Sequence, residues 1–333
     1  METNPLTFLT EVSLPSNKIN DFTEQKLPSQ ATDKPVKLIN KKIICILTRT
    51  YNPYWFNFLK NNLIKNDFFG TKSEDTYEIY MVIDKNPGEE SLANKHKEIN
   101  DFVNFYTLSS QDTEKPFILP SQDNIFGGGI AEAKINIVQV SDELCIQSKY
   151  YKSSSCTNLK DIVAWDKALY FFTRYETDYD SIWFLEDDVL FYDLNTIQKI
   201  DAKYPSSDLL SSFHEINESG NIYNGWNHWC NVVNRIATPW AHSLISASRL
   251  SRRLMERVDE YVKNNNSLMF IEALFSTLAL HNNYLVDNPE ELVSSITYDK
   301  KWSIEEMTDK NKIYHPLKKT EEHEMYRKRM GET

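Results

Sequence analysis

Glycine and cysteine are both scarce in this sequence of 333 residues. Only 8 glycines are present, which excludes collagen-like and glycine-rich low-complexity chains. The four cysteines are widely spaced and form no Cys-x-x-Cys pair. This spacing predicts neither a zinc knuckle nor a dense disulfide framework, and we expect reduced thiols in a cytoplasm-like compartment.

Long apolar runs are also missing. No segment approaches the roughly 18 consecutive apolar residues that identify a membrane-spanning helix. Residues 1–5 show no basic region followed by an apolar core, so no secretory signal is predicted. From these features we expect no integral membrane segment and a cytoplasmic location.

Positive charge is not in excess. The chain has 37 basic and 48 acidic side chains, a net charge of −11, which disfavours nucleic acid as a partner. A local basic pocket for a small phosphorylated ligand is still compatible with this balance. Hydrophobic residues make up 41% of the chain and aromatic residues 13%, enough for a substantial core.

Hydrophobic periodicity begins after residue 40. Residues 1–40 mix Pro, Ser, Asn, Gln and Lys without a repeat, and we expect a flexible N-terminal extension. Beyond it, strands are predicted over 42–50, 77–83, 102–108, 135–140, 181–185 and 208–214, and helices over 53–66, 158–175, 196–203, 249–263 and 268–281. The triple glycine 127–129 lacks the residues of a phosphate-binding loop, so loop flexibility is the favoured interpretation.

The order of these elements predicts an α/β fold. Strand, helix and strand in succession indicate a parallel βαβ unit, and hence a Rossmann-like, mostly parallel central sheet flanked by helices. We expect one domain over 41–318, with a mixed region in its second half, followed by a charged C-terminal tail over 319–333.

The stretch 181–191 joins an apolar run of strand length to three consecutive carboxylates, Glu186, Asp187 and Asp188. Their mutual repulsion costs free energy unless a cation, hydrogen bonds or solvent offset it. Mg²⁺ and Mn²⁺ favour carboxylate oxygens together with substrate phosphates. The alternative is a strand that runs into a solvated acidic turn.

Charged residues interrupt two otherwise apolar segments. Asp166 and Lys167 lie in the helix that leads to the acidic strand, where they face either solvent or the same ligand. Glu272 is nearly the only ionisable group in 268–281, and burial raises the pKa of a carboxyl toward the range of a general base. A structural glutamate that caps a neighbouring loop is the alternative.

Two further groups carry binding chemistry. Trp226, His228 and Trp229 match the apolar face and hydroxyl rim of a sugar ring, with an aromatic mini-core as the alternative. His315 is followed three residues later by Lys318, whose charge would neutralise a phosphate that a metal also contacts.

Four features follow one another along the chain: the strand end Thr48-Arg49-Thr50, the strand end at Asp84, the triplet Glu186-Asp187-Asp188 and the late His315. Together they resemble the nucleotide-sugar-dependent glycosyltransferases of the GT-A fold. The resemblance covers residues 41–318, and the acidic triplet is its recognisable motif.

The resemblance implies donor and metal roles. The residues implied to contact the nucleotide-sugar are Thr48, Arg49, Thr50, Asp84, Asp166, Lys167, Glu186, Asp187 and Lys318. The Asp-x-Asp motif of the family holds Mn²⁺ or Mg²⁺ against the donor diphosphate. Here Glu186 occupies its first position and Asp188 its last, and His315 matches a further ligand.

The resemblance also implies the reaction. Residues 41–190 would bind the donor and 191–318 the acceptor, with Trp226, His228 and Trp229 at the acceptor and Glu272 as the base of an inverting enzyme. The expected activity is metal-dependent transfer of a sugar from a nucleoside-diphosphate sugar, UDP-sugar being favoured. The acceptor is a hydroxyl of a glycan, a glycoprotein or another molecule.

Two other classes compete with this one. A sugar-nucleotide nucleotidyltransferase would carry a Gly-rich loop with Arg and Lys directly after its first strand, whereas residues 49–55 contain no glycine. The alternative is a catalytically inactive carbohydrate-binding or scaffolding domain, which an upward shift in melting temperature with UDP and Mn²⁺ would not by itself exclude.

Overall fold

The computed structural model describes residues 40–65, 75–84, 103–109, 117–119, 135–154 and 161–332. The chain divides into two compact units, Met1–Leu38 and Ile39–Thr333, and the described residues belong to the second. Residues 1–39 of the predicted extension and the triple glycine 127–129 lie outside the described residues.

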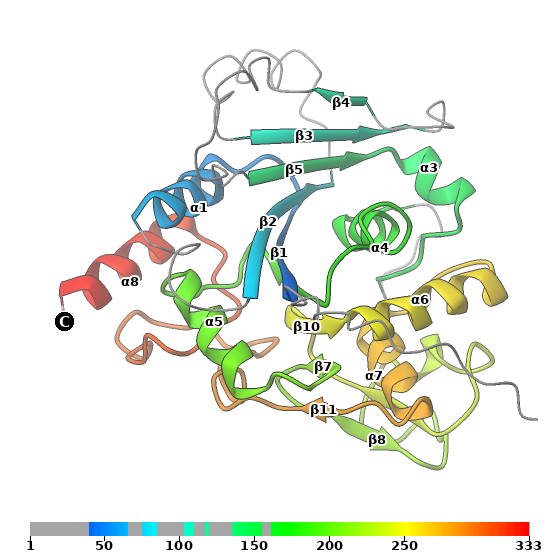
Figure 1. The fold of residues 1–333 in the computed structure, drawn as a ribbon. Coiled ribbons are helices and arrows are strands. Elements are labelled where there is room, and N and C mark those ends of the chain that lie inside the picture. The colour runs from blue at the N-terminus through cyan, green and yellow to red at the C-terminus, as the bar shows by residue number, and fades with distance from the viewer. Residues whose placement is uncertain are drawn as a thin grey trace, which may run out of the picture. The chain divides into compact units, whose positions relative to one another are not determined.

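A central sheet of nine described strands has the order β11-β7-β10-β6-β1-β2-β5-β3-β4 (Figure 1). Its strands are β1 (Asn40–Thr48), β2 (Asp75–Ile83), β3 (Val103–Leu108), β4 (Phe117–Leu119), β5 (Ile135–Val140), β6 (Ser181–Glu186), β7 (Leu209–Leu210), β10 (Ala247–Ser251) and β11 (Val286–Asp287). Strands β6, β1, β2, β5 and β3 run parallel, while β10 is antiparallel to β6 and β7, and β4 is antiparallel to β3. The predicted α/β class with a mostly parallel central sheet is confirmed. Strands β8 (Glu215–Asn217) and β9 (Trp240–His242) form a separate antiparallel pair.

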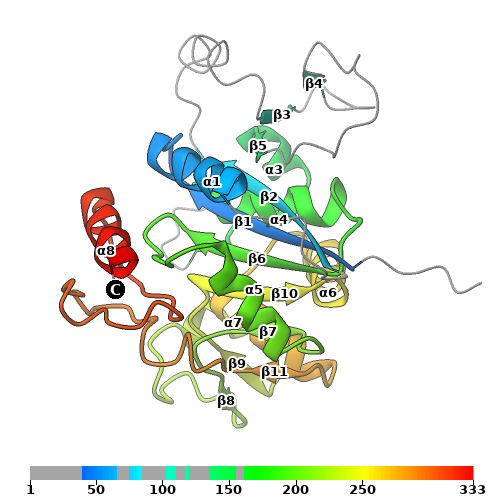
Figure 2. The ribbon, with the colours of Figure 1, turned by 60° about the vertical axis from the view of Figure 1, so that its left-hand side comes forward.

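Helices cover both faces of the sheet. They are α1 (Pro53–Lys65), α3 (Asp142–Gln147), α4 (Ala164–Arg174), α5 (Leu194–Lys203), α6 (Arg252–Asn265), α7 (Ile271–His281) and α8 (Thr320–Glu332). Helices α1, α5 and α8 lie on one side, and α3, α4, α6 and α7 on the other (Figures 1 and 2). Alternate residues of β1 divide accordingly, because successive side chains of a strand point to opposite faces. Ile43 and Cys45 belong to the core with α4, α6 and α7, and Ile44 and Ile46 to the core with α1 and α5.

Several predicted elements have different bounds. Helix α4 begins at Ala164 rather than 158, because Val163 is extended and precedes the first turn. Helix α6 begins at Arg252 rather than 249, because the preceding residues pair with β6 and β7 as part of β10. Helix α7 begins at Ile271, and only Leu209–Leu210 of the predicted strand 208–214 pairs in the sheet. At the start of α6, strand pairing overrode the propensity of residues 249–251 to form a helix.

The charged tail predicted over 319–333 is instead folded as helix α8. Tyr326 and Met330 are buried in a small core cluster with Leu190 and Tyr314. The guanidinium of Arg327 lies 3.6 Å from the ring centroid of Phe58. The prediction of a tail was wrong because the apolar positions of this helix are few and are separated by charged residues, which hides the packed face in the sequence.

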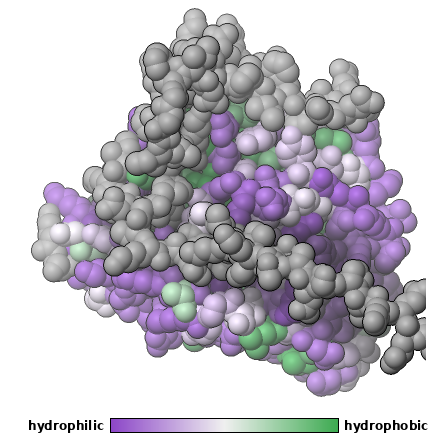
Figure 3. Space-filling model, viewed as in Figure 1, coloured by the Kyte–Doolittle hydropathy of each residue, from purple (hydrophilic) through white to green (hydrophobic). Residues whose placement is uncertain are grey.

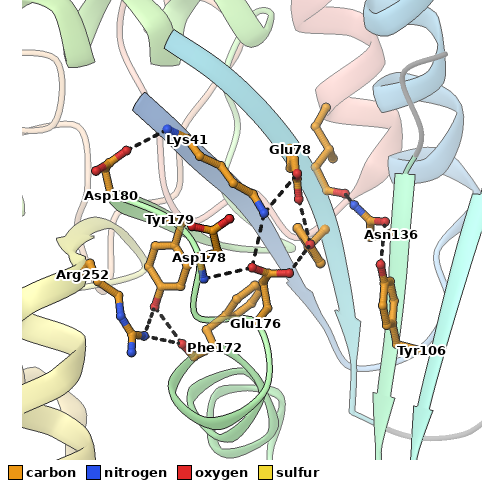
Figure 4. Close-up of polar contacts among 12 residues, drawn as sticks. Lys41, Glu78, Tyr106, Asn136, Phe172, Glu176, Asp178, Tyr179, Asp180 and Arg252 are labelled. Carbon is orange, nitrogen blue, oxygen red and sulfur yellow. Dashed lines mark hydrogen bonds and ion pairs between the residues drawn. The ribbon is translucent and has the colours of Figure 1, made fainter. Parts of the chain in front are cut away.

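Ion pairs and hydrogen bonds hold the amino-terminal end of β1 (Figure 4). The ammonium of Lys41 contacts Glu78 of β2 at 3.1 Å and Glu176 at 3.3 Å. The backbone N–H of Lys41 donates to the carboxylate of Asp180 at 2.7 Å. These contacts join β1 and β2 to the connection between α4 and β6, and they leave the other end of the strands free to form a site.

The described surface in Figure 3 is mostly hydrophilic, with hydrophobic residues present singly or in small groups. This agrees with the burial of the apolar side chains in the core clusters. Within the described ranges, no helix is long and apolar enough to cross a membrane.

Candidate active site

The carboxyl ends of three parallel strands meet at one edge of the sheet. The register of β1 sets Thr48 beside Ile83 of β2 and Leu47 beside Glu186 of β6. A cleft of about 580 Å³ opens at this edge. It is lined by Leu47, Thr48, Arg49, Asp84, Asp142, Asp161, Ile162, Val163, Ala164, Trp165, Glu186, Asp187 and Asp188. Clefts beyond the carboxyl ends of strands are the usual ligand sites of open α/β sheets.

Backbone hydrogen bonds join the acidic turn after β6 to the segment that carries His315. Leu190 and Tyr314 exchange two N–H···O bonds of 2.8 Å each. The N–H of Leu317 donates to the carbonyl of Asp188, also at 2.8 Å. Val189 and Leu190 are fully buried, which anchors the turn from below. The turn after β6 and the segment around His315, which are distant in sequence, are therefore paired at fixed positions.

Glu186, Asp188 and His315 form a compact group. One potential ligand atom from each residue lies within 4.8 Å of the others. Nε2 of His315 is 3.3 Å from Oδ1 of Asp188 and 3.8 Å from Oε2 of Glu186. Burial opposes a charge on His315, but the hydrogen bond and charge of Asp188, the charge of Glu186 and the carbonyl of Thr297 together outweigh it, so the pKa of His315 is raised from its usual value. In the described part of the chain this is the one cluster of His, Cys, Asp and Glu with such spacing.

The imidazole of His315 has a fixed orientation. Its Nδ1 lies 2.8 Å from the carbonyl oxygen of Thr297, and because a carbonyl only accepts, Nδ1 carries the proton. In the neutral ring, Nε2 then presents a lone pair toward the two carboxylates. This pairing of one ring nitrogen with a carbonyl is the arrangement that orients metal-binding histidines.

Two tryptophans hold the acidic residues. The indole N–H of Trp165 donates to Oε1 of Glu186 at 2.8 Å, and that of Trp55 donates to the carbonyl of Asp187 at 3.0 Å. The pKa of Asp187 is raised, first by burial and then by the charge of Asp188. Indole N–H groups therefore contact the acidic residues. Arg49 is the only Lys or Arg among the residues that line the cleft.

The other residues predicted to contact the nucleotide differ in their positions. Thr48, Arg49 and Asp84 line the cleft. Thr50 is exposed and outside the lining, and its carbonyl accepts a hydrogen bond of 2.7 Å from the hydroxyl of Thr48. Lys318 is also exposed and is not part of the lining.

Asp166 and Lys167 lie beneath the cleft rather than in its wall. The carboxylate of Asp166 accepts backbone N–H bonds from Ser153 at 3.0 Å and Val163 at 2.9 Å, which caps the start of α4. Burial nevertheless raises the pKa of Asp166 to about 7. Asp166 is fully buried and each of its oxygens accepts a backbone bond, so its direct contact with a donor stays a prediction.

Lys167 connects two acids of the cleft wall. Its buried ammonium lies 3.4 Å from Oδ1 of Asp84 and 2.7 Å from Oδ1 of Asp142, and it donates to the carbonyl of Asp84. The exposed fraction of the Lys167 side chain is only 5%. Lys167 thus fixes acidic groups at the end of β2 and the start of α3, and it does not itself line the cleft.

Glu272 lies in the first turn of α7 and is 8% exposed. Its Oε2 accepts a hydrogen bond from the hydroxyl of Tyr298. Burial raises the pKa of Glu272 to about 7, although the bond from Tyr298 acts in the opposite direction. The charge of Glu186 also raises the pKa of this carboxyl and that of His315 lowers it. Glu272 is therefore electrostatically coupled to the group of Glu186, Asp188 and His315.

The aromatic residues predicted to contact an acceptor form a cluster. Trp229 is fully buried and its indole N–H donates to the carbonyl of Asn224 at 2.7 Å, which agrees with the alternative of an aromatic mini-core. Trp226 stacks on His242 at 4.3 Å and on Phe270 at 5.5 Å. Both rings lie nearly parallel to the indole, with interplanar angles of 11° and 7°.

His228 is half-buried and packs edge-on against Trp226 and Phe270. It retains exposed surface next to the cluster. Of the three predicted acceptor contacts, Trp226 and His228 are thus accessible in part, and the mini-core alternative accounts for Trp229.

Several residues of the site were missed in the sequence. Trp165 and Asp142 line the cleft, and Thr297 and Tyr298 hold His315 and Glu272. Among these four, a signal existed only for Trp165, a large aromatic residue directly before Asp166 and Lys167. The others occupy ordinary polar segments, and their position depends on tertiary packing alone.

Comparisons with known proteins give structural neighbours only. No family model and no curated protein matches the chain. Mouse xyloside xylosyltransferase 1, in its apo form, is 8% identical with a TM-score of 0.39, over 84% of this chain and 98% of that chain. The mannosyltransferase Ktr4p from S. cerevisiae is 10% identical with a TM-score of 0.33, over 75% and 67%. Core-mannan synthase A from Aspergillus fumigatus, in an Mn/GDP form, is 11% identical with a TM-score of 0.32, over 75% and 71%. The function is therefore argued from the site itself.

Proposed function

We propose that the chain is a metal-dependent glycosyltransferase of GT-A-like fold. In this proposal it moves a sugar from a nucleoside-diphosphate sugar, with UDP-sugar favoured, to a hydroxyl of a glycan, glycoprotein or other acceptor. The supporting observation is the group Glu186, Asp188 and His315 beside a cleft at the carboxyl ends of parallel strands.

The donor set of this group fits a Mn²⁺ or Mg²⁺ ion. Carboxylate oxygens suit both ions, and the neutral imidazole nitrogen of His315 favours Mn²⁺ of the two. The acids would otherwise repel one another at close range. When bound, the metal would neutralise charge on the diphosphate leaving group.

The cleft has the size of a small-ligand site, since such sites measure roughly 300–1,000 Å³. In the proposal, Thr48, Arg49 and Asp84 contact the nucleotide. Arg49 supplies positive charge for a phosphate, and Lys318 reaches the diphosphate from the segment that carries His315. Lys167 keeps Asp84 in place through their ion pair of 3.4 Å.

Glu272 acts as the general base in this proposal. The acceptor oxygen attacks the anomeric carbon, its proton passes to Glu272, and the bond from that carbon to the diphosphate oxygen breaks. Direct displacement inverts the anomeric configuration. A carboxyl with a pKa of about 7 is well matched to proton transfer near neutral pH.

A donor screen tests the proposal. The full chain would be incubated with UDP- and GDP-sugars and with Mn²⁺, Mg²⁺ or a chelator, while released nucleotide is measured with a panel of sugar acceptors. We expect nucleotide release from at least one donor that needs the metal. In a separate incubation with a nucleoside triphosphate and a sugar 1-phosphate, release of pyrophosphate would instead identify a nucleotidyltransferase. If no donor is turned over or stabilises the protein with metal present, the proposal is wrong.

A further inference from the structure

The short segment 296–298 contacts two groups on which the proposed reaction depends. The carbonyl of Thr297 accepts the Nδ1–H bond of His315 at 2.8 Å. The hydroxyl of the next residue, Tyr298, donates to Oε2 of Glu272. Adjacent residues therefore orient a candidate metal ligand and the candidate base.

This segment is itself firmly held. Ile296 is 2% exposed and its backbone forms a parallel bridge with His315. The N–H of His315 donates to the carbonyl of Ser295 at 3.0 Å, and the N–H of Thr297 donates to the carbonyl of His315 at 3.1 Å. The indole N–H of Trp302 donates to the same carbonyl at 3.0 Å. The backbone that carries the side chain of Tyr298 is therefore fixed relative to His315.

We propose that Tyr298 is a positioning residue for Glu272, and that segment 296–298 sets the position of the base relative to His315. The inference rests on the proposed function. Tyr298 does not take the acceptor's proton. Its hydroxyl holds Oε2 of Glu272, which leaves Oε1 to receive that proton. Because one rigid segment contacts both groups, the base and the metal ligand keep a constant separation.

The exposure of the two partners agrees with this role. Tyr298 is 49% exposed, whereas Glu272 is 8% exposed. The phenol therefore lies between solvent and a buried carboxylate, where an acceptor would enter. The charged and titratable groups that act on Glu272 are Tyr298, Glu186 of β6 and His315. Of these, only Tyr298 donates a hydrogen bond to Glu272.

Tyr298→Phe tests the proposal because it removes the hydroxyl and keeps the ring. We expect kcat to fall by roughly tenfold or more, since a general base contributes about 10²–10⁴-fold and depends on its position. The KM of the donor and the affinity for Mn²⁺ should change by less than about twofold. The acid limb of the kcat profile should move to higher pH, because the lost bond favours ionised Glu272. The matched control is Tyr284→Phe, whose hydroxyl bonds to Arg257 outside the site.

A readout without turnover separates this proposal from the proposed function. The titration of the Glu272 carboxyl would be followed by infrared difference spectra against Glu272→Gln. It should shift to higher pH in Tyr298→Phe and in Tyr298→Leu, a second variant in case one folds poorly. An unchanged titration, or wild-type kcat in an active Tyr298→Phe enzyme, overturns the positioning role. A shifted titration in a protein that transfers no sugar would overturn the proposed function alone.

Discussion

Nε2 of His315 lies 3.3 Å from Oδ1 of Asp188, although most of the acceptor half of the chain separates the two residues. The contact follows from the backbone. The paired N–H···O bonds of Leu190 and Tyr314, together with the bond from Leu317 to Asp188, fix both side chains at the edge of the cleft. The proposed metal centre is thus built from the end of one strand and one late segment.

Removal of His315 should weaken metal binding. His315→Gln deletes one nitrogen ligand, and we expect the Kd for Mn²⁺ to rise by about 10–100-fold, the usual range even for partners that only orient a ligand. Titration with Mn²⁺ followed by electron paramagnetic resonance measures this. His281→Gln, at an exposed histidine bonded to the carbonyl of Pro239, is the control. Equal Mn²⁺ affinity in the two variants would contradict the assignment of His315.

Glu272→Gln should abolish transfer and preserve donor binding. The amide does not accept a proton, so we expect kcat to fall by about 10²–10⁴-fold. The wild-type rate should rise as pH increases through about 7, because the base acts only when ionised and its pKa is raised to that value. Steady-state rates and donor affinity check both points. The control Glu218→Gln, at an exposed glutamate, should leave kcat unchanged. Near-normal turnover by Glu272→Gln would show that Glu272 is not the base.

The buried ion pair of Asp201 and Arg249 should dominate local stability. Both residues are 1% exposed, and Nη1 of Arg249 lies 2.6 Å from Oδ1 of Asp201. The same carboxylate accepts bonds from Tyr77 and Trp183. Asp201→Ala leaves a buried cation unpaired, which costs about 3–5 kcal/mol of unfolding free energy. Urea unfolding measures the loss, and Asp178→Ala, at an exposed aspartate, should change stability by less than about 0.5 kcal/mol.

Helix α8 should contribute to the stability of the fold. Tyr326 is fully buried, whereas Met325 on the same helix is 57% exposed. Tyr326→Ala creates a cavity and should lower the unfolding free energy by about 3–5 kcal/mol, while Met325→Ala should have almost no effect. Thermal or urea unfolding distinguishes them. Equal stability of both variants would mean that residues 319–333 do form a free tail.

The five parallel strands β1, β2, β3, β5 and β6 and most helices followed from hydrophobic patterns. The run 135–140 was predicted with the bounds of β5, because four of its six residues are Ile or Val, at positions 135, 137, 138 and 140. Residues 249–251 were assigned to a helix by their charges and leucine, but they pair with β6 and β7. Helix α8 and the buried position of Trp229 depend on contacts with distant segments, which no local pattern records.

The site was predictable to a similar degree. Three adjacent carboxylates at the end of a strand identified one side of it, and the resemblance to a family supplied His315. The supporting role of Asp166 and the contact between Tyr298 and Glu272 depend on the folding of loops around the cleft. Sequence patterns therefore located the charged groups, while the structure determines which of them face the cleft.

Metal-dependent nucleotide release by wild type and Asp188→Asn tests the central claim most directly. With the best donor and acceptor from the screen, wild type should release nucleotide with Mn²⁺ and stop when the metal is chelated. Asp188→Asn should be inactive under both conditions, and Asp178→Asn should behave as wild type. Nucleotide release that persists in chelator, or in Asp188→Asn with Mn²⁺, would contradict a metal-dependent transferase built on this group.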